Sequence, residues 1–256
     1  MSHFAACPLC FFVAGVESRT MNFFERPIVM AEALWARDHV KLAPEPPGAR
    51  DGIVTAADQD RLLPRKALRL VAVGDSLVAG CGTADQADSL TPRIAARLSN
   101  NTERPVAWET HAKLGATMRR VRHRLLPEMS GHADVLFLSA GSNDILAGRN
   151  AKEWASELDA VLAMAEERAT RTVLCSAGQL HNAPKLPRAL RRELGRRMDE
   201  QTAISRELCA SRGVTYIDVT HVPLVDGFWA SDGFHPGPRG YEMAAELVVT
   251  GMQQAT

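Results

Sequence analysis

The sequence predicts an α/β fold in which helices cover both faces of one parallel sheet. Five short runs rich in Val, Leu and Ile are typical of strands buried on both faces: Leu68–Val73, Pro105–Thr110, Ala133–Ser139, Arg171–Ser176 and Val214–Val219. Helical patterns alternate with them: Thr91–Ser99, Ala116–Met129, Ala151–Thr170, Ala189–Arg212 and Pro238–Met252. Such alternation implies right-handed crossovers, so we expect a three-layer α/β/α sandwich with a five-stranded parallel sheet.

The composition is that of an ordinary globular enzyme. Apolar residues make up 46% of the 256 residues and charged residues 23%. Lys plus Arg equals Asp plus Glu, at 30 each, so the net charge is 0 and gives no overall attraction to nucleic acid or anionic lipid. Basic runs at 119–124 and 188–197 are broken by apolar residues at helical spacing, as in solvated helix faces. We therefore expect no nucleic-acid partner.

The cysteines and histidines do not form a recognisable metal-binding pattern. Cys7 and Cys10 are a lone CxxC without a second ligand pair, which supports a zinc site poorly. Cys175 lies in an apolar run and Cys209 in a helical pattern, where buried free thiols are the rule. No HExxH spacing occurs. We expect neither a metal nor an organic cofactor.

Residues 1–65 differ from the rest and are predicted to be an N-terminal extension and linker before a domain at 66–256. Within them, 31–40 matches a short helix, and the Pro- and Gly-rich stretch 41–52 predicts an extended surface linker. The apolar run 4–16 has the length of a signal-peptide core but no preceding Lys or Arg and no clear cleavage site. We expect a cytoplasmic protein without integral membrane association. Secretion through residues 1–20, or a true start at Met21 or Met30, are the alternatives.

Chemically useful residues follow the first predicted strand. Gly74, Asp75 and Ser76 place a hydroxyl on a tight turn at the carboxyl edge of the sheet, where ligands bind in such folds. The alternative is a plain turn, since Asp and Ser are favoured in turns anyway. Dinucleotide, P-loop and nucleophile-elbow motifs do not fit, since Thr83 to Asp85 follow Gly80-Cys81-Gly82, no Gly-Lys pair exists, and Val78 stands where an elbow needs Gly.

Three other strand ends or loops carry candidate groups. The block 141–144 reads Gly-Ser-Asn-Asp, in which Asn143 either holds a turn or donates to an oxyanion. Gly115 opens a helical pattern, either as a hinge or to bring a backbone N–H close to a ligand. Asp232 precedes His235 by three residues and can reach its Nδ1, leaving Nε2 free to take a proton from a serine. The alternative for this pair is a solvent-exposed loop.

Together these four blocks resemble, in their order and letters, the SGNH hydrolase superfamily, also called GDSL esterases and lipases. The resemblance covers about residues 66–256. It implies a flavodoxin-like fold and a serine hydrolase in which Ser76 is the nucleophile, His235 the base and Asp232 the group that orients His235. It also implies an oxyanion hole built from the N–H groups of Ser76 and Gly115 and the side chain of Asn143. A Ser–His dyad without Asp232 is the alternative to the triad.

The substrate is less well determined than the chemistry. Leu77, Phe228, Trp229 and Phe234 are close in sequence to the candidate catalytic residues and either line an acyl pocket or pack in the core. We expect a small-molecule acyl ester as substrate. A carbohydrate acetyl ester, a thioester and a catalytically silent ligand-binding protein are the alternatives. The sequence does not set the oligomeric state.

Overall fold

The computed structural model describes residues 25–55 and 66–254. The apolar run 4–16, the CxxC pair and the alternative start at Met21 lie outside these residues. Within the described ranges, no helix combines the length and the apolar character that crossing a bilayer requires.

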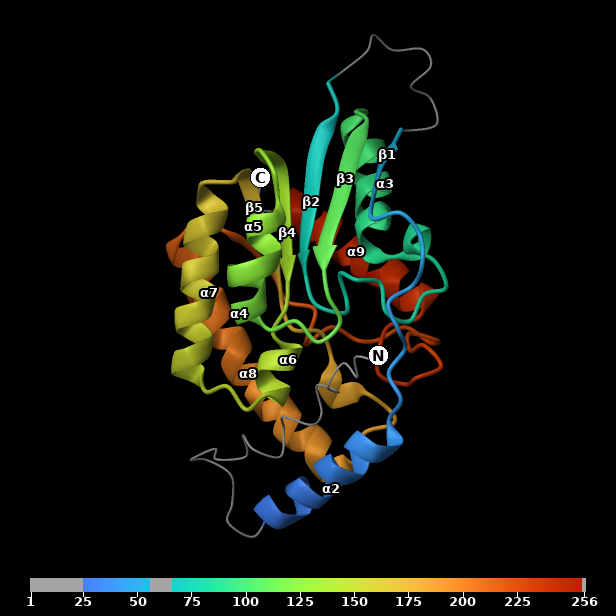
Figure 1. Ribbon diagram of the computed structural model, residues 1–256, viewed down its shortest axis with the longest axis vertical. Helices are drawn as coiled ribbons and strands as arrows, with labels where there is room; N and C mark the ends of the chain where they lie inside the picture. Colours follow the sequence, from blue (N-terminus) through green and yellow to red (C-terminus); the bar gives the residue numbers. More distant parts are fainter. Residues whose placement is uncertain (1–24, 56–65, 255–256) are drawn as a thin grey trace, which may run out of the picture.

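The centre of the molecule is a six-stranded sheet in which five strands are parallel (Figure 1). Its strands are β1 (Asp51–Val54), β2 (Leu68–Gly74), β3 (Val106–Ala112), β4 (Ala133–Ser139), β5 (Ala169–Cys175) and β6 (Thr215–Ile217), in the spatial order β1-β3-β2-β4-β5-β6. The order reverses at β2, and in such sheets the ligand crevice lies at that reversal, outside the carboxyl ends of the strands.

The predicted parallel sheet is confirmed, but the strand count of five was one too low. The additional strand, β1, has four residues, two of them exposed, and pairs antiparallel with β3 at the edge of the sheet. Natural sheets often protect their edges with very short strands of this kind. Its first two residues, Asp51 and Gly52, lie in the stretch 41–52, which the sequence predicts to be linker.

Helices cover both faces of the sheet, as predicted. The helical elements are α2 (Arg26–His39), η2 (Gln86–Asp88), α3 (Leu90–Thr102), α4 (Met118–Arg120), η3 (Val121–Leu125), α5 (Leu126–Glu128), α6 (Ser142–Leu146), α7 (Ala151–Glu166), η4 (Leu180–Asn182), α8 (Arg188–Ser211) and α9 (Pro238–Gln254). The segment α4–η3–α5 is one helical run whose middle part is π-helical. The sequence does not predict α6, which follows β4 directly.

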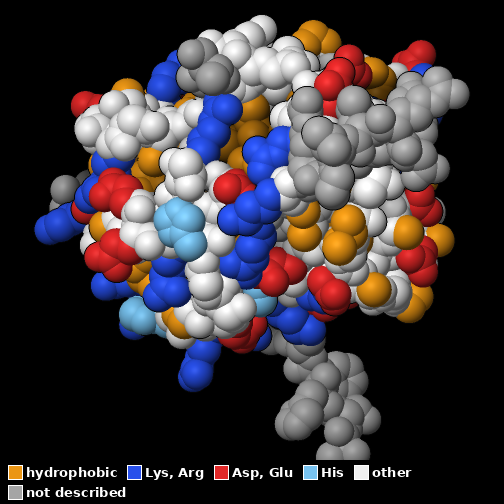
Figure 2. Space-filling model, turned by 90° about the horizontal axis from the view of Figure 1, so that it is seen from above, with side chains coloured by type: hydrophobic (Ala, Val, Ile, Leu, Met, Phe, Trp, Pro, Cys, Tyr) orange, Lys and Arg blue, Asp and Glu red, His pale blue; other side chains and the backbone are white. Residues whose placement is uncertain are grey.

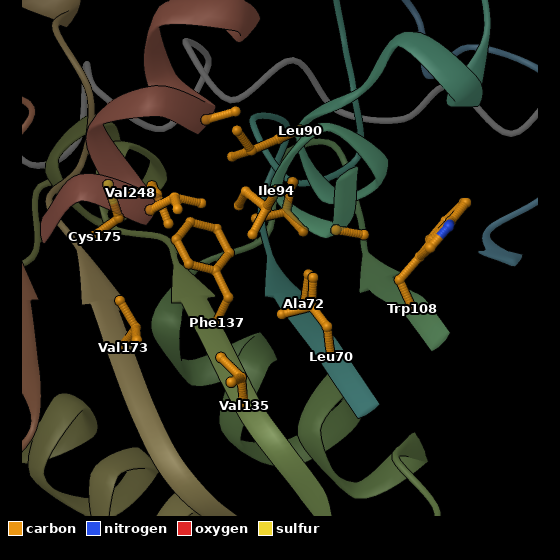
Figure 3. Packing of buried hydrophobic residues seen from close by; sticks show 14 of the residues in the cluster. Leu70, Ala72, Leu90, Ile94, Trp108, Val135, Phe137, Val173, Cys175 and Val248 are labelled. Atoms are coloured by element: carbon orange, nitrogen blue, oxygen red, sulfur yellow. The ribbon is translucent and has the colours of Figure 1, made fainter. Parts of the chain in front are cut away.

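Each face of the sheet has its own hydrophobic core. On one face, Leu70, Phe137 and Val173 point toward α3 and α9, where they meet Ile94 and Val248 (Figure 3). On the other face, a second cluster joins the sheet to α4–η3–α5, α7 and α8. Burial of strand residues on both faces accounts for the nearly continuous apolar runs of the sequence.

A third cluster lies beyond the carboxyl edge of the sheet and includes α2. Val29, Ala33 and Ala36 of this helix are buried against Leu190 and Leu194 of α8. Figure 1 shows α2 at the lower end of the molecule, across the N-terminal part of α8. The division of the chain at residue 65 stays a prediction, but the described part of the extension packs against the rest of the protein.

The opposite end of the molecule, at the amino ends of the parallel strands, is charged. Seen from above, Lys and Arg side chains gather in a band across this face, with Asp and Glu side chains around it (Figure 2). The four blocks that contain Ser76, Gly115, Asn143 and His235 lie at the other end, where the parallel strands finish.

Candidate functional site

The turn after β2 brings Ser76 to the carboxyl edge of the sheet. Gly74, the last residue of β2, is required there, because a Cβ on it would lie 2.0 Å from the carbonyl oxygen of Ser139 at the end of β4. The next amide, that of Asp75, donates to the same carbonyl at 3.0 Å. Asp75 then accepts the N–H of Leu77 through Oδ1 at 3.0 Å, which closes the turn around the half-buried Ser76.

The loop before α9 holds the Asp232–His235 pair. Ala230 N–H donates to the carbonyl of His235 at 2.9 Å, and Gly237 N–H donates to the carbonyl of Phe228 at 2.7 Å, so the loop folds back on itself. Asp232 Oδ2 lies 2.7 Å from Nδ1 of His235. Both side chains are buried, so the solvent-exposed loop considered from the sequence is not what the structure shows.

The carboxylate of Asp232 is held by several donors at once. Its Oδ1 accepts the backbone N–H groups of Phe234 and His235, each at 2.9 Å, and its Oδ2 also accepts the N–H of Ala43 at 2.9 Å. Burial alone would raise the pKa of Asp232, but these hydrogen bonds and the one from His235 keep it well below its usual range. Asp232 is therefore ionised at neutral pH and orients the imidazole with Nδ1–H toward it.

That orientation leaves the second ring nitrogen of His235 available. Nε2 is buried and has no hydrogen-bond partner within residues 25–55 and 66–254. Buried polar atoms are nearly always paired in native proteins. An unpaired imidazole nitrogen beside a cavity that also contains Ser76 is therefore a candidate for proton transfer with a ligand or with the serine.

The block after β4 connects to the loop that contains Gly115. Asn143 donates its side-chain N–H to the carbonyl of Ala116 at 2.9 Å, and Asp144 Oδ2 accepts the N–H of Met118 at 2.8 Å. Gly115 has φ +79°, in the left-handed region that favours glycine. Asn143 has two amide hydrogens, so one remains for another acceptor.

A cavity at this edge of the sheet brings three of the five predicted site residues together. Ser76, Asn143 and His235 all line it, and it is partly open to solvent. Asp232 lies behind His235 and does not line the cavity. Gly115 does not line it either, but it directly precedes Ala116, to which Asn143 is bonded.

The rest of the cavity wall is mainly apolar. The four residues considered as an acyl pocket or as core all line it, and three of them, Leu77, Trp229 and Phe234, also pack in a core cluster. Binding of an acyl group there stays a prediction. The apolar lining residues are Leu77, Ala177, Leu180, Val219, Val222, Phe228, Trp229, Phe234, Pro236, Met243, Ala244 and Leu247. The last three come from α9, which the sequence predicts only as a covering helix.

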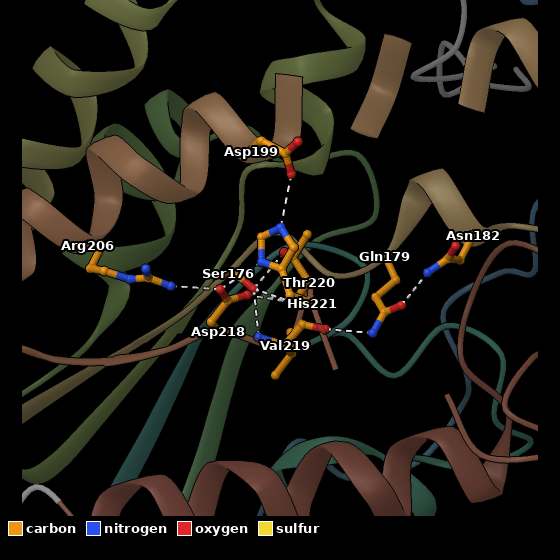
Figure 4. A network of polar contacts seen from close by, with 9 residues as sticks. All are labelled: Ser176, Gln179, Asn182, Asp199, Arg206, Asp218, Val219, Thr220 and His221. Atoms are coloured by element: carbon orange, nitrogen blue, oxygen red, sulfur yellow. Dashed lines mark hydrogen bonds and ion pairs between the residues drawn. The ribbon is translucent and has the colours of Figure 1, made fainter. Parts of the chain in front are cut away.

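Gln179, which the sequence analysis missed, fixes one side of this wall. Its buried amide donates to the carbonyl of Val219 at 2.7 Å (Figure 4). It also donates to the carbonyl of Val222 at 2.8 Å. Ser176 Oγ accepts the backbone N–H groups of Val219 at 2.9 Å and Thr220 at 3.0 Å. Gln179 and Ser176 follow β5, so the same strand-end rule that indicated Ser76 would have found them.

Ion pairs of His221 hold the outer side of the loop that follows β6. His221 lies between two carboxylates, with Nδ1 2.8 Å from Asp218 and Nε2 2.9 Å from Asp199 of α8 (Figure 4). Hydrogen bonds to Asp199 and Asp218 raise the pKa of His221. This ion-pair network, partly exposed, joins the loop after β6 to α8.

Two buried carboxyls accompany the candidate site. Burial, with the nearby charge of Asp144, raises the pKa of Asp75 to about 7, and burial raises that of Asp144 to about 7 as well. Both accept a backbone N–H, so their first role is to hold the turns that carry Ser76 and Asn143. In the part of the chain that the structure describes, no three or more His, Cys, Asp or Glu side chains are grouped to hold a metal ion.

Comparisons with solved structures agree with this fold. The fold is similar to LAE5, an alpha/beta hydrolase enzyme from the metagenome of Lake Arreo, with a TM-score of 0.59, 18% identity, and 75% of this chain and 98% of that chain covered. It is also similar to a lipase/acylhydrolase from Enterococcus faecalis, with a TM-score of 0.57, 21% identity and coverages of 73% and 96%. An acetylxylan esterase from Geobacillus stearothermophilus, Axe2, gives 0.52, 14%, 73% and 93%. At these identities the likeness shows the fold alone.

The sequence comparison identifies the family. No curated protein sequence matches the chain significantly. The model of the GDSL-like lipase/acylhydrolase family matches residues 72–243, which include the turn of Ser76, the Gly115 loop, the Asn143 block and the Asp232–His235 pair. Because this match spans more than half of the 256 residues, and the fold agrees with it, the chain belongs to the GDSL-like lipase/acylhydrolase family of hydrolases, as the four sequence blocks predict.

Proposed function

We propose that the protein is a serine hydrolase that cleaves acyl esters through an acyl-enzyme on Ser76. The observation that carries the proposal is the cavity that Ser76 shares with His235, whose Nδ1 is bonded to an ionised carboxylate and whose Nε2 is unpaired among the described residues. A serine, an oriented imidazole and a carboxylate are the groups that acyl transfer needs.

In the first half of the reaction, His235 acts as the base. Nε2 removes the hydroxyl proton as Ser76 Oγ attacks the ester carbonyl. The imidazolium that forms is stabilised by the charge of Asp232, which stays ionised because its hydrogen bonds lower its pKa. His235 then gives the proton to the leaving alcohol, and the acyl group remains on Ser76.

The developing negative charge on the carbonyl oxygen needs preset donors. The proposed donors are the N–H groups of Ser76 and Gly115 and the free amide hydrogen of Asn143. The bond from Asn143 to Ala116 supports this set, because it ties the side chain to the residue after Gly115. In the second half of the reaction, His235 activates a water that hydrolyses the acyl-enzyme, and the same donors stabilise the second tetrahedral intermediate.

The apolar wall supports an acyl chain longer than acetyl. The aromatic and aliphatic side chains of the loop 219–234 and of α9 offer contact to methylene groups, each worth about 0.8 kcal/mol when buried. Apart from the proposed catalytic groups, two polar side chains of the wall are already used inside the protein: Gln179 donates to two carbonyls and Ser142 Oγ to the carbonyl of Ala177. A carbohydrate ester would need such groups free for its hydroxyls.

A fluorophosphonate probe tests the reaction class, because it labels only an activated serine. The wild type should label, and Ser76→Ala should neither label nor hydrolyse p-nitrophenyl esters while keeping its far-UV circular dichroism. Ser142→Ala is the matched control, since that hydroxyl lines the same cavity but donates to a carbonyl, and this variant should still label. Absence of labelling in the folded wild type would favour a ligand-binding protein.

The acyl specificity is tested separately by a series of p-nitrophenyl esters from acetate to decanoate. We expect kcat/KM to rise from acetate to medium chain lengths. A maximum at acetate, with activity on acetylated xylo-oligosaccharides, would favour the carbohydrate acetylesterase instead.

A further inference from the structure

Residues 40–50, here called the strap, connect α2 to β1 and run beside the candidate site. The strap contacts the Asp232 loop with its first part and the loop 112–115 with its middle part. The sequence predicts this stretch to be a surface linker, and nothing in the four family blocks involves it. Its contacts reach two parts of the proposed catalytic machinery, Asp232 and the loop that contains Gly115.

The first contact is the backbone bond from Ala43. Its N–H donates to Oδ2 of Asp232, the same oxygen that accepts from His235. The strap thus helps to fix the carboxylate that orients the imidazole.

The second contact is made by the side chain of Glu45. Its Oε1 accepts the backbone N–H of Leu114 at 2.7 Å and lies 3.2 Å from Nζ of Lys113. Its Oε2 pairs with Arg50 at 2.7 Å, and Arg50 in turn donates to the carbonyl of Ala112, also at 2.7 Å. One carboxylate and its guanidinium partner therefore hold the backbone on both sides of Lys113.

The strap is itself anchored beside the nucleophile turn. Gln86 is fully buried, donates its side-chain amide to the carbonyls of Pro46 and Ala79, and donates its backbone N–H to the carbonyl of Pro47 at 2.8 Å. The segment that carries Glu45 is thus fixed to the chain just after Ser76. Glu45 therefore connects the turn of Ser76 with the loop that contains Gly115.

We propose that Glu45 is a positioning residue that sets the orientation of the Gly115 N–H toward the reacting carbonyl. The proposal rests on the proposed function, in which Gly115 supplies one oxyanion donor. The amide that Glu45 holds, that of Leu114, immediately precedes the amide of Gly115. Glu45 therefore restrains the backbone torsions on the N-terminal side of the donor, while Asn143 holds its C-terminal side through Ala116.

The size of the effect follows from the function of such donors. Loss of one complete oxyanion donor lowers kcat by about 10² to 10³. Glu45→Ala leaves the Gly115 N–H in place but frees its loop, so we expect kcat to fall by roughly 10- to 100-fold. Because an oxyanion donor acts mainly in the transition state, KM should change less than threefold.

Three variants separate positioning from general destabilisation. Glu45→Gln keeps an oxygen that can accept the Leu114 N–H and should recover at least a third of the wild-type kcat. Glu45→Asp keeps the charge but shortens the side chain by one methylene and should behave like Glu45→Ala. The matched control is Glu153→Ala, which also removes a carboxylate that accepts a backbone N–H and pairs with an arginine, but at the start of α7.

The decisive measurements are kcat and KM for a p-nitrophenyl ester and the Ki of an alkyl boronic acid, which forms a tetrahedral adduct on an active serine. We expect kcat to fall and Ki to rise by similar factors in Glu45→Ala and Glu45→Asp, but not in Glu153→Ala. If wild type hydrolyses esters and Glu45→Ala and Glu45→Asp both match Glu153→Ala in kcat and Ki, the proposal is wrong. If Glu45→Ala does not fold, Glu45→Asp and Glu45→Gln decide alone. A wild type that neither hydrolyses esters nor labels refutes the proposed function instead.

Discussion

Asp232 contacts His235 through both of its carboxylate oxygens: Oδ2 lies 2.7 Å from the ring nitrogen Nδ1, and Oδ1 accepts the backbone N–H of His235 at 2.9 Å. The two bonds fix the ring relative to its own main chain. A spacing of three residues in a loop permits this arrangement without requiring it, and the structure favours the triad over the dyad.

The triad predicts a strong effect of Asp232→Asn. The amide can still accept the backbone N–H groups, so the fold should be kept, but it carries no charge to support the imidazolium and can favour the wrong tautomer. We expect kcat to fall by about 10³ or more and the acidic limb of the kcat/KM profile to move to lower pH. Nearly wild-type kcat with an unmoved limb would mean that Ser76 and His235 work as a dyad.

Asn143→Ala should lower kcat by roughly 10² to 10³ with a much smaller change in KM, the pattern of a lost transition-state donor. Because Asn143 also donates to the carbonyl of Ala116, we expect a second effect, a loss of about 1 kcal/mol in the free energy of unfolding. Steady-state kinetics and urea denaturation measure the two effects separately. A change confined to KM would show that Asn143 contacts the substrate in its ground state.

Gln179→Ala should change acyl selectivity. The variant leaves the carbonyls of Val219 and Val222 without their donor in a largely buried place, at a cost of about 1–3 kcal/mol each if water does not replace it. The wall of the cavity loosens, so KM should rise several-fold for long p-nitrophenyl esters and less for acetate. Asn182→Ala is the control, because it removes only the bond to Gln179 Oε1. Equal KM changes for all chain lengths would contradict the assignment.

The buried carboxyls predict a pH-dependent stability. The pKa of Asp75 is raised from 3.8 to about 7, so the folded protein binds more protons than the unfolded chain between these values, and this residue makes stability fall as pH rises from about 4 to about 7. Asp75→Asn cannot ionise and still offers an oxygen to Leu77 N–H. Its stability relative to wild type should therefore be greater at pH 8 than at pH 4 by roughly 1–3 kcal/mol, since one pKa unit is about 1.4 kcal/mol.

Chemical denaturation at the two pH values measures this difference. Asp232→Asn serves as a contrast, because a pKa held low by hydrogen bonds stabilises the fold above the ordinary value of 3.8, and this contribution is lost only as pH falls below it. A gain for Asp75→Asn that is the same at pH 4 and pH 8 would show that Asp75 does not titrate in this range.

A chain that starts at Met30 should fold and keep most of its activity. It lacks the first turn of α2 and with it the buried side chain of Val29, whose burial contributes about 1–3 kcal/mol. It retains the strap, so the site stays complete. A chain that starts at Asp51 lacks Ala43 and Glu45. We expect its kcat/KM to fall much further than that of the chain that starts at Met30. Equal activity of both truncations would make residues 30–50 dispensable for catalysis.

The sequence predicts well what local periodicity and the strand-end rule govern. Buried parallel strands have strong apolar runs, and polar residues after them must meet at one edge of the sheet. The strand-end rule predicts the places of Ser76 and Asn143, and the three-residue spacing from Asp232 predicts that of His235, and all three of Ser76, Asn143 and His235 line one cavity. Gly115 also has a local reason, its positive φ, whereas Gly74 is required by the close approach of Ser139 on the neighbouring strand.

Contacts between distant segments could not be predicted in this way. β1 has only two apolar residues and is a strand because β3 offers it a free edge. Glu45 resembles any charged residue of a Pro-rich linker until the loop of Leu114 lies against it. Phe234 shows why pocket and core were inseparable in the sequence, since it is buried in a core cluster and lines the cavity as well.

The contact of the strap with the Asp232 loop has a consequence for how the candidate site forms during folding. Ala43 and Asp232 are separated by 189 residues, so their hydrogen bond can form only after the whole segment between them has been synthesised. Closing so long a loop costs conformational entropy before the contact stabilises the fold, which slows the formation of such contacts. We expect the proposed esterase activity to appear on refolding only once the C-terminal loop has docked against the strap, so recovery of activity should not precede recovery of the folded signal.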